Sequence, residues 1–218
     1  MDKLTELFKR HHTKKFKEYG ATAKGVDWND ENEMLFRYKK MMDVLNRDFE
    51  KPEGIPTVLD VGCGWGGLLA YCLGNRIKVE YTGIDIVESM INYAQKNFDN
   101  GEFILGDVFE HNPERKYDYV ICNAIMTQKL TASIPEMENF TNRLILKMFE
   151  LCQYGIAFNL MSTRVNFMVD NLYYRSPVEL LNFCFIEVSP RIKLDHGYSS
   201  LKRGKGKFYD YTVFIYKD

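Results

Sequence analysis

The chain has 218 residues, and its 29 basic and 30 acidic side chains leave a formal net charge of -1. This length suits one globular domain, and so balanced a charge excludes a strong long-range attraction for nucleic acid or for an anionic membrane. We therefore expect a small-molecule substrate, no nucleic-acid partner and no membrane, and the oligomeric state stays open.

The cysteines give a second constraint on the class of protein. There are five of them, an odd number, and no two form a CxxC pair, which is typical of neither a disulfide framework nor a zinc site. The N-terminus has no apolar signal-peptide core, and nowhere do 18 apolar residues run together. These features predict a cytoplasmic protein without a bound metal.

Residues 2–50 have the spacing of polar helices, with apolar side chains three and four positions apart. A loop punctuated by glycine, Gly20–Asp30, interrupts them and contains Trp28. The segment Lys51–Pro56 then breaks the chain. We expect an N-terminal helical lid at 1–50 and a core domain at 51–218.

In the core, short apolar runs alternate with helical patterns, which predicts βαβ units on a parallel sheet. The last two extended runs have no helix between them and predict an antiparallel hairpin that closes the sheet. The basic cluster Lys202–Lys207 before the last run is interpreted as a solvated turn. The seven expected strands are Thr57–Val61, Val79–Ile84, Phe103–Leu105, Tyr117–Cys122, Ile156–Leu160, Phe185–Leu194 and Phe208–Tyr216; helices are expected near 66–73, 88–98, 136–152 and 177–183.

A glycine-rich turn follows the first expected strand. Its glycines at 62, 64, 66 and 67 bring bare backbone to a ligand at the start of a helix, because glycine lacks a Cβ and tolerates positive φ. The spacing Gly62-x-Gly64-x-x-Gly67, with Asp85 about 20 positions on, also satisfies the dinucleotide fingerprint. The glycines alone fit two cofactors.

Two carboxylates and the chain's ending favour one of them. Asp60 stands at the end of the strand, where it would face a pyrophosphate unfavourably but attract a cationic group. Asp107 follows the third strand, at the same edge of the sheet. The dinucleotide fingerprint requires no carboxylate at this position. The terminal hairpin is foreign to an all-parallel dinucleotide fold.

The runs LDVGCGWGG, TGIDI, GDVF and YDYVICNAI resemble, in order and spacing, the motifs of class I S-adenosylmethionine-dependent methyltransferases over about residues 55–130. The resemblance implies a seven-stranded Rossmann-like α/β sheet, mostly parallel, and S-adenosyl-L-methionine as methyl donor with S-adenosyl-L-homocysteine as product. By this resemblance the cofactor-binding residues are Asp60, Gly62 and Gly64 for the methionine part, Asp85 for the ribose, Ile86, Asp107 and Val108 for adenine, and Asn123 at the passage to the substrate.

A weaker resemblance extends to small bacterial methyltransferases from surface-polysaccharide or specialised-metabolite gene clusters. It rests on His11-His12, the stretch from Tyr19 to Trp28, Tyr173-Tyr174 and the late His196-Gly197-Tyr198. In that subgroup an aspartate stands where this chain has Gly197, so the two endings differ.

Methyl transfer is an in-line displacement, and a base is needed only when the acceptor is protonated. Histidine suits a hydroxyl acceptor because its pKa lies near neutrality. The candidates are His196, His12 and His11, whereas His111 is expected in a surface turn.

Aromatic and polar side chains near the expected cavity complete the candidate site. Tyr19 and Trp28 flank the glycine loop and are candidates to clamp the cofactor, since aromatic faces attract a sulfonium. Arg175 would suit an anionic acceptor. The candidate substrate-binding residues are Met126, Asn159, Tyr173, Tyr174, Arg175 and Tyr198.

The motif Asn/Asp-Pro-Pro-Tyr/Phe of N-methyltransferases that act on nucleic acids or proteins is absent after Asn123, where the chain reads Ala124-Ile125-Met126. We therefore expect transfer to an oxygen of a sugar, a phosphate-type group or another small metabolite. A small-molecule N-methyltransferase, an NAD-dependent oxidoreductase and a non-catalytic S-adenosylmethionine-binding module stay as alternatives. An aminopropyltransferase would need further carboxylates after the fourth strand, and residues 123–129 have none.

Overall fold

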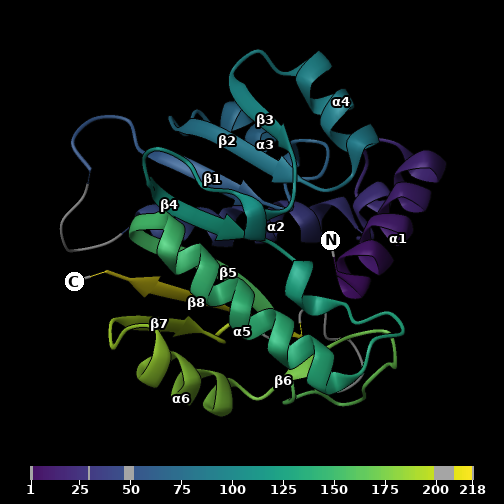
Figure 1. Ribbon diagram of the computed structural model, residues 1–218, viewed down its shortest axis with the longest axis vertical. Helices are drawn as coiled ribbons and strands as arrows, with labels where there is room; N and C mark the ends of the chain where they lie inside the picture. Colours follow the sequence, from purple (N-terminus) through teal and green to yellow (C-terminus); the bar gives the residue numbers. More distant parts are fainter. Residues whose placement is uncertain (1, 29, 47–51, 199–208, 218) are drawn as a thin grey trace.

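A computed structural model describes residues 2–28, 30–46, 52–198 and 209–217 of the chain. They form one eight-stranded sheet in the order β3-β2-β1-β4-β5-β8-β7, with β6 paired to β5 beside this path (Figure 1). The strands are β1 (Thr57–Val61), β2 (Glu80–Asp85), β3 (Gly101–Leu105), β4 (Tyr117–Cys122), β5 (Cys152–Ser162), β6 (Tyr174–Arg175), β7 (Ile192–Asp195) and β8 (Asp210–Tyr216).

The first five strands pair in parallel, and β8 runs antiparallel between β5 and β7. The expected parallel sheet and closing hairpin are thus confirmed. The expected number of strands was wrong by one, because Tyr174 and Arg175 add the short strand β6 to β5. A two-residue strand is too short to leave a period-two pattern in a sequence.

Six α-helices and four short 3-10 helices are described, and side-chain caps define where several begin. Asp2 and Ser176 accept hydrogen bonds from backbone N–H groups in the first turns of α1 and α6, and Ser133 forms a capping box with Glu136 at α5. The helices are α1 (Lys3–Tyr19), η1 (Lys24–Val26), α2 (Glu31–Met42), η2 (Asp43–Leu45), α3 (Gly67–Gly74), α4 (Glu88–Asn97), η3 (Val108–Glu110), η4 (Ile125–Thr127), α5 (Ile134–Leu151) and α6 (Pro177–Glu187).

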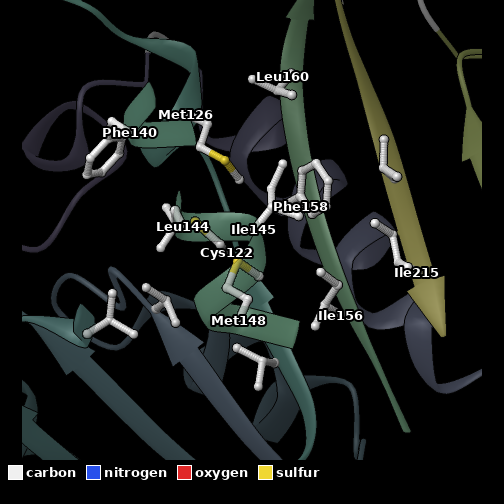
Figure 2. Close-up of a cluster of buried hydrophobic side chains, with 14 of the residues drawn as sticks. Cys122, Met126, Phe140, Leu144, Ile145, Met148, Ile156, Phe158, Leu160 and Ile215 are labelled. Carbon is white, nitrogen blue, oxygen red and sulfur yellow. The ribbon is translucent and has the colours of Figure 1, made fainter. Parts of the chain in front are cut away.

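Helices cover both faces of the sheet, so alternate residues of a strand enter different cores. Leu59 packs on the face that α5 and α6 cover, whereas its neighbour Val58 packs with α2, α3 and α4. Figure 2 shows the first core, where Ile145 and Met148 of α5 lie beside Phe158 and Ile156 of β5.

The expected strand Phe185–Leu194 was wrong in its first part. Residues up to Glu187 continue α6, because Leu180 and Cys184 lie four positions apart and are both fully buried, and Val188 N–H caps the helix on the Cys184 carbonyl. The strand β7 begins only at Ile192. The basic cluster at 202–207 and the first expected residue of the last strand, Phe208, lie outside the described residues.

All five cysteines are buried free thiols. Burial raises the pKa of each thiol above its usual value. None of the described helices combines the length and the apolar character needed to span a membrane, and the described residues contain no cluster of three metal-ligating side chains.

Candidate active site

A cavity of about 500 Å³ opens at the carboxyl ends of β1, β2 and β4. This is the volume of an ordinary small-ligand pocket, at the edge of a parallel sheet where ligands commonly bind. Residues of α1 and of the following loop, including His12 and Trp28, form part of its wall. In Figure 1, α1 (purple) lies beyond the ends towards which the arrows of β1 and β2 point.

The glycine turn after β1 forms one wall of the cavity. Gly62 and Gly64 both have positive φ, 72° and 56°, which favours glycine over any other residue. A Cβ on Gly62 would also collide with the side chain of Ile125. The turn is held to the next strand, since Gly62 N–H donates to the Ile84 carbonyl over 2.8 Å.

Asp85 at the end of β2 is fixed by two backbone donors. Gly64 N–H donates to Oδ2 over 2.9 Å and Val87 N–H to Oδ1 over 2.8 Å. Burial raises the pKa of this carboxyl group despite these hydrogen bonds. A rigid carboxylate that lines a cavity is a strong acceptor for ligand hydroxyl groups.

Asp60 at the end of β1 lies deeper. It is 3% exposed and accepts a 2.7 Å hydrogen bond from the Tyr81 hydroxyl. Burial raises its pKa to about 7, with the nearby Asp85 charge contributing and the Tyr81 hydrogen bond opposing the shift. Such a group favours a positively charged partner, because a cation restores the ionised form that burial disfavours.

Asp107 stands at the end of β3 and lines the same cavity. Its side chain also caps η3, accepting a 3.0 Å hydrogen bond from Phe109 N–H. Ile86 and Val108 line the cavity as well. All three strand-end carboxylates named in the sequence analysis therefore meet at one edge.

Two buried amide oxygens in the cavity wall, Asn123 Oδ1 and Gln128 Oε1, have no hydrogen-bond partner among the described residues. A buried acceptor left unpaired costs about 1–3 kcal/mol. Both oxygens therefore favour a ligand that brings hydrogen-bond donors.

The residues between α1 and α2 contribute a second group of polar side chains. Asp27 receives hydrogen bonds from His11 (2.8 Å) and Gln128 (2.8 Å) and an ion pair from Lys15 (2.6 Å). Burial alone would raise the pKa of Asp27, but these three partners lower it to about 2. The cluster ties the N-terminal segment to the loop after β4.

His12 lines the cavity, whereas His11 faces Asp27 and does not. Burial, assisted by the neighbouring His11, lowers the pKa of His12 to about 4. The ring is therefore neutral at pH 7, because burial disfavours its protonated form.

A buried charge network joins α2 to the first residue of β8. Arg37 donates to both carboxylate oxygens of Asp210 over 2.9 and 3.1 Å, and its guanidinium lies 4.2 Å from the ring centre of Trp28. Asn159 also donates to Asp210 over 2.9 Å, and its Oδ1 accepts from Ala124 N–H over 2.8 Å. These contacts connect Trp28 to Ala124, the residue that follows Asn123, through Arg37, Asp210 and Asn159.

Several residues singled out from the sequence do not line the cavity. Of the six candidate substrate-binding residues only Tyr174 does so. The others are placed as follows: Met126 and Tyr173 are in the core, Asn159 is in the Asp210 network, Arg175 bonds to Asn142, and Tyr198 bonds to Thr212.

Besides His11, two candidates outside that group do not line the cavity. Tyr19 is 38% exposed at the end of α1. His196 packs edge-on against Tyr211, with ring centres 5.8 Å apart, and its Nε2 is buried without a partner among the described residues.

Sequence reasoning missed the cavity residues Gln128, Asp27 and Arg37. Gln128 follows η4 with no motif around it, and its partner Asp27 lies 101 positions earlier. The one available sequence signal was the aspartate in a glycine-punctuated loop, because Asp tolerates positive φ; the structure gives Asp27 a φ of 66°.

The sheet order, the glycine turn and three strand-end carboxylates around one cavity define a Rossmann-like methyltransferase that uses S-adenosylmethionine. Comparison with known proteins agrees. A family model described as "Methyltransferase domain" matches residues 56–187, and the chain belongs to this family.

Two curated relatives and one solved structure illustrate the similarity. The candidate methyltransferase Rv1506c of Mycobacterium tuberculosis is 26% identical over 74% of this chain and 93% of its own length. Malonyl-[acyl-carrier protein] O-methyltransferase of Acetivibrio thermocellus is 36% identical, but the match spans only 55% of this chain and 39% of that protein. A solved DhpI–SAM–HEP complex has the same fold, with a TM-score of 0.64 at 16% identity, over 100% of this chain and 99% of that one.

Proposed function

We propose that the cavity binds S-adenosylmethionine through the three strand-end carboxylates and transfers its methyl group to an oxygen of a small polar metabolite. The residues present fit the donor, because Asp60 favours a cationic ammonium or sulfonium and Asp85 accepts from ribose hydroxyl groups. Asp107 with Ile86 and Val108 would hold the adenine, and Asn123 Oδ1 offers a buried acceptor that needs a donor.

Bound S-adenosylmethionine supplies a methyl group already activated by its sulfonium leaving group, so alignment carries much of the catalysis. In this proposal His12 is the base that takes the proton of the acceptor hydroxyl on a ring nitrogen. Its position in the cavity wall supports the role. Its lowered pKa leaves the ring unprotonated at pH 7 but makes it a weaker base than an exposed histidine. His11 would position the loop through Asp27, and the distance of His196 from the cavity wall disfavours it as the base.

Residues 1–50 would act as a lid over the donor. The support is that His12, Val26 and Trp28 line the cavity and that Gln128 fastens Asp27 to the loop after β4. Trp28 would present an aromatic face to the cofactor. The five free thiols support the expected cytoplasmic location.

Transfer to nitrogen is the second candidate. The unpaired oxygens of Asn123 and Gln128 would accept from an amine as well as from a hydroxyl. A sugar of a polysaccharide precursor remains one candidate among the oxygen acceptors.

Calorimetry tests the donor site. S-adenosylhomocysteine is expected to bind the wild-type chain below millimolar, and Asp85→Ala is expected to abolish that binding, because the variant removes the acceptor held by Gly64 and Val87. Asp99→Ala, at an exposed position outside the cavity, serves as the control. Failure of the wild type to bind, or full binding by Asp85→Ala, would disprove the proposal.

The base is tested by methyl transfer from labelled S-adenosylmethionine to cytosolic sugars, phosphorylated metabolites and other small molecules. Once an acceptor is found, His12→Ala should lower kcat about 10²–10⁴-fold without weakening S-adenosylhomocysteine binding, as for loss of a general base. His111→Ala is the control, because His111 contacts Tyr117 away from the cavity. Labelling of amines alone would contradict the preference for oxygen.

A further inference from the structure

The cavity continues past the donor site onto an apolar surface at its mouth. We call this surface the apolar shelf; it consists of Phe167, Val169, Leu172, Tyr174 and Tyr209, all of which line the cavity. Phe167 is 62% exposed and Val169 38% exposed. Exposed apolar side chains gathered at the mouth of a binding cavity indicate a surface that a ligand covers.

Contacts between three segments hold the shelf in place. The rings of Phe167 and Tyr209 lie with centres 5.8 Å apart, and Val169 N–H donates to the Tyr174 hydroxyl over 3.2 Å. The shelf is therefore a defined surface built by the loop after β5, by β6 and by the residue before β8.

The inner end of the shelf meets the polar part of the cavity. Leu172 forms an isolated antiparallel bridge with Gln128, and Tyr173 N–H donates to the Thr127 carbonyl over 2.9 Å. Gln128 Oε1, buried and unpaired, therefore lies where the shelf begins. A ligand that extends along the shelf would bring one end to this oxygen.

The charges of the cavity oppose an anionic ligand. Among the described lining residues Arg37 is the only lysine or arginine, and its guanidinium already pairs with Asp210 and with Glu33. Burial keeps His12 neutral at pH 7. The acidic side chains of the wall, by contrast, include Glu33 and Asp27 in addition to the three carboxylates of the donor site.

From this arrangement we infer that the methyl acceptor is an uncharged or cationic amphiphile: an apolar or aromatic body covers the shelf, and its nucleophilic hydroxyl or amine lies beside Gln128. This inference rests on the proposed function, because it assigns the acceptor half of the same site. In the transfer, the acceptor heteroatom forms the new bond to the methyl carbon while the carbon–sulfur bond breaks and its electron pair returns to sulfur. The proton of the hydroxyl, or of the amine once it is methylated, passes to His12. The small polar acceptor proposed above thus becomes one with an apolar part, and the phosphate-type acceptor expected from the sequence is disfavoured.

Neutral 4-alkylphenols of increasing chain length test the shelf. Their affinity is measured by calorimetry with and without saturating S-adenosylhomocysteine, whose own binding is measured first. Affinity is expected to rise about fourfold for each added methylene that the shelf covers. The anionic 3-(4-hydroxyphenyl)propionate is expected to bind about tenfold more weakly than 4-propylphenol, because the described lining residues offer its carboxylate no lysine or arginine other than the paired Arg37.

Phe167→Ser should weaken the binding of 4-butylphenol about tenfold, which is the effect of losing a moderate interface contact. It should leave S-adenosylhomocysteine binding unchanged. Phe185→Ser is the matched control, because Phe185 is also exposed, at 53%, but lies on α6 outside the cavity wall. A flat response to chain length, equal binding of the propionate, or equal effects of the two variants would overturn the inference. If the wild type does not bind S-adenosylhomocysteine, the donor site is refuted instead. The phenol titrations done without S-adenosylhomocysteine would then still test the shelf.

Discussion

Asp60 is a single buried carboxyl group whose raised pKa would couple binding of a cationic ligand to pH. Its pKa of about 7 lies above that of an exposed aspartate, so the folded chain holds an extra proton between those two values. The group's contribution to stability is therefore complete at low pH and is lost as pH rises through about 7. A bound cation reverses this preference by favouring the ionised form.

We predict that S-adenosylhomocysteine binds more tightly as pH rises towards 7 and then reaches a plateau. The slope should approach about tenfold per pH unit, the limit for release of one proton. Asp60→Asn should remove the slope. Titration calorimetry in buffers of different ionisation enthalpy measures the proton release, and an unchanged slope in Asp60→Asn would contradict the assignment.

At the scale of residues, local sequence predicted well which carboxylates gather at the cavity. Asp60, Asp85 and Asp107 stand at or just after the carboxyl ends of strands whose patterns are plain, and these ends meet at one edge. Five of the six residues proposed for the acceptor do not line the cavity. Arg175 looked available for an anion, but it is 5% exposed and bonds to Asn142 of α5, a contact that no local pattern encodes.

At the scale of elements, the buried pair of Arg37 and Asp210 fastens α2 to β8 across 173 positions of sequence. We predict that Arg37→Ala lowers the free energy of unfolding by about 3–5 kcal/mol, because it leaves a buried carboxylate without its partner. Urea denaturation measures the change.

Lys40→Ala is the control for that variant, since Lys40 joins the same helix to Asp195 but both side chains are more than a fifth exposed. Its loss should cost no more than about 1 kcal/mol. Equal effects of the two variants would show that the buried pair is not the fastening between α2 and β8.

The elements also show which patterns mislead. The run from Phe185 to Val188 is apolar except for Glu187 and suits a strand, yet it ends a helix, because burial of Leu180 and Cys184 follows the helical period. The fifth strand was expected over five residues and spans 11. Pairing with β4 extends it back to Cys152, and pairing with β8 and β6 extends it forward to Ser162. Long-range pairing therefore decided the length of β5, and the local sequence does not contain it.

At the scale of the whole molecule, donor binding should stabilise the fold, because a ligand that binds only the folded chain shifts the equilibrium towards it. The carboxylates proposed to bind the donor stand at the ends of three strands. At 100 times its dissociation constant, S-adenosylhomocysteine should add about 2.7 kcal/mol. For a chain of this size that corresponds to a rise in Tm of about 5–10 °C. Differential scanning calorimetry measures it, and an equal rise with NAD would revive the oxidoreductase alternative.

The five buried thiols make the local opening of the whole molecule measurable by their rates of alkylation. Because burial keeps each thiol protonated and covered, an alkylating reagent can react only when the fold opens around it. Cys63 stands in the glycine turn itself, whereas Cys152 and Cys184 lie in the core between the sheet and its helices. The order in which the five thiols react would therefore show which part of the molecule opens first. Reaction of Cys63 before the other four would report local opening of the cavity, separately from unfolding of the chain.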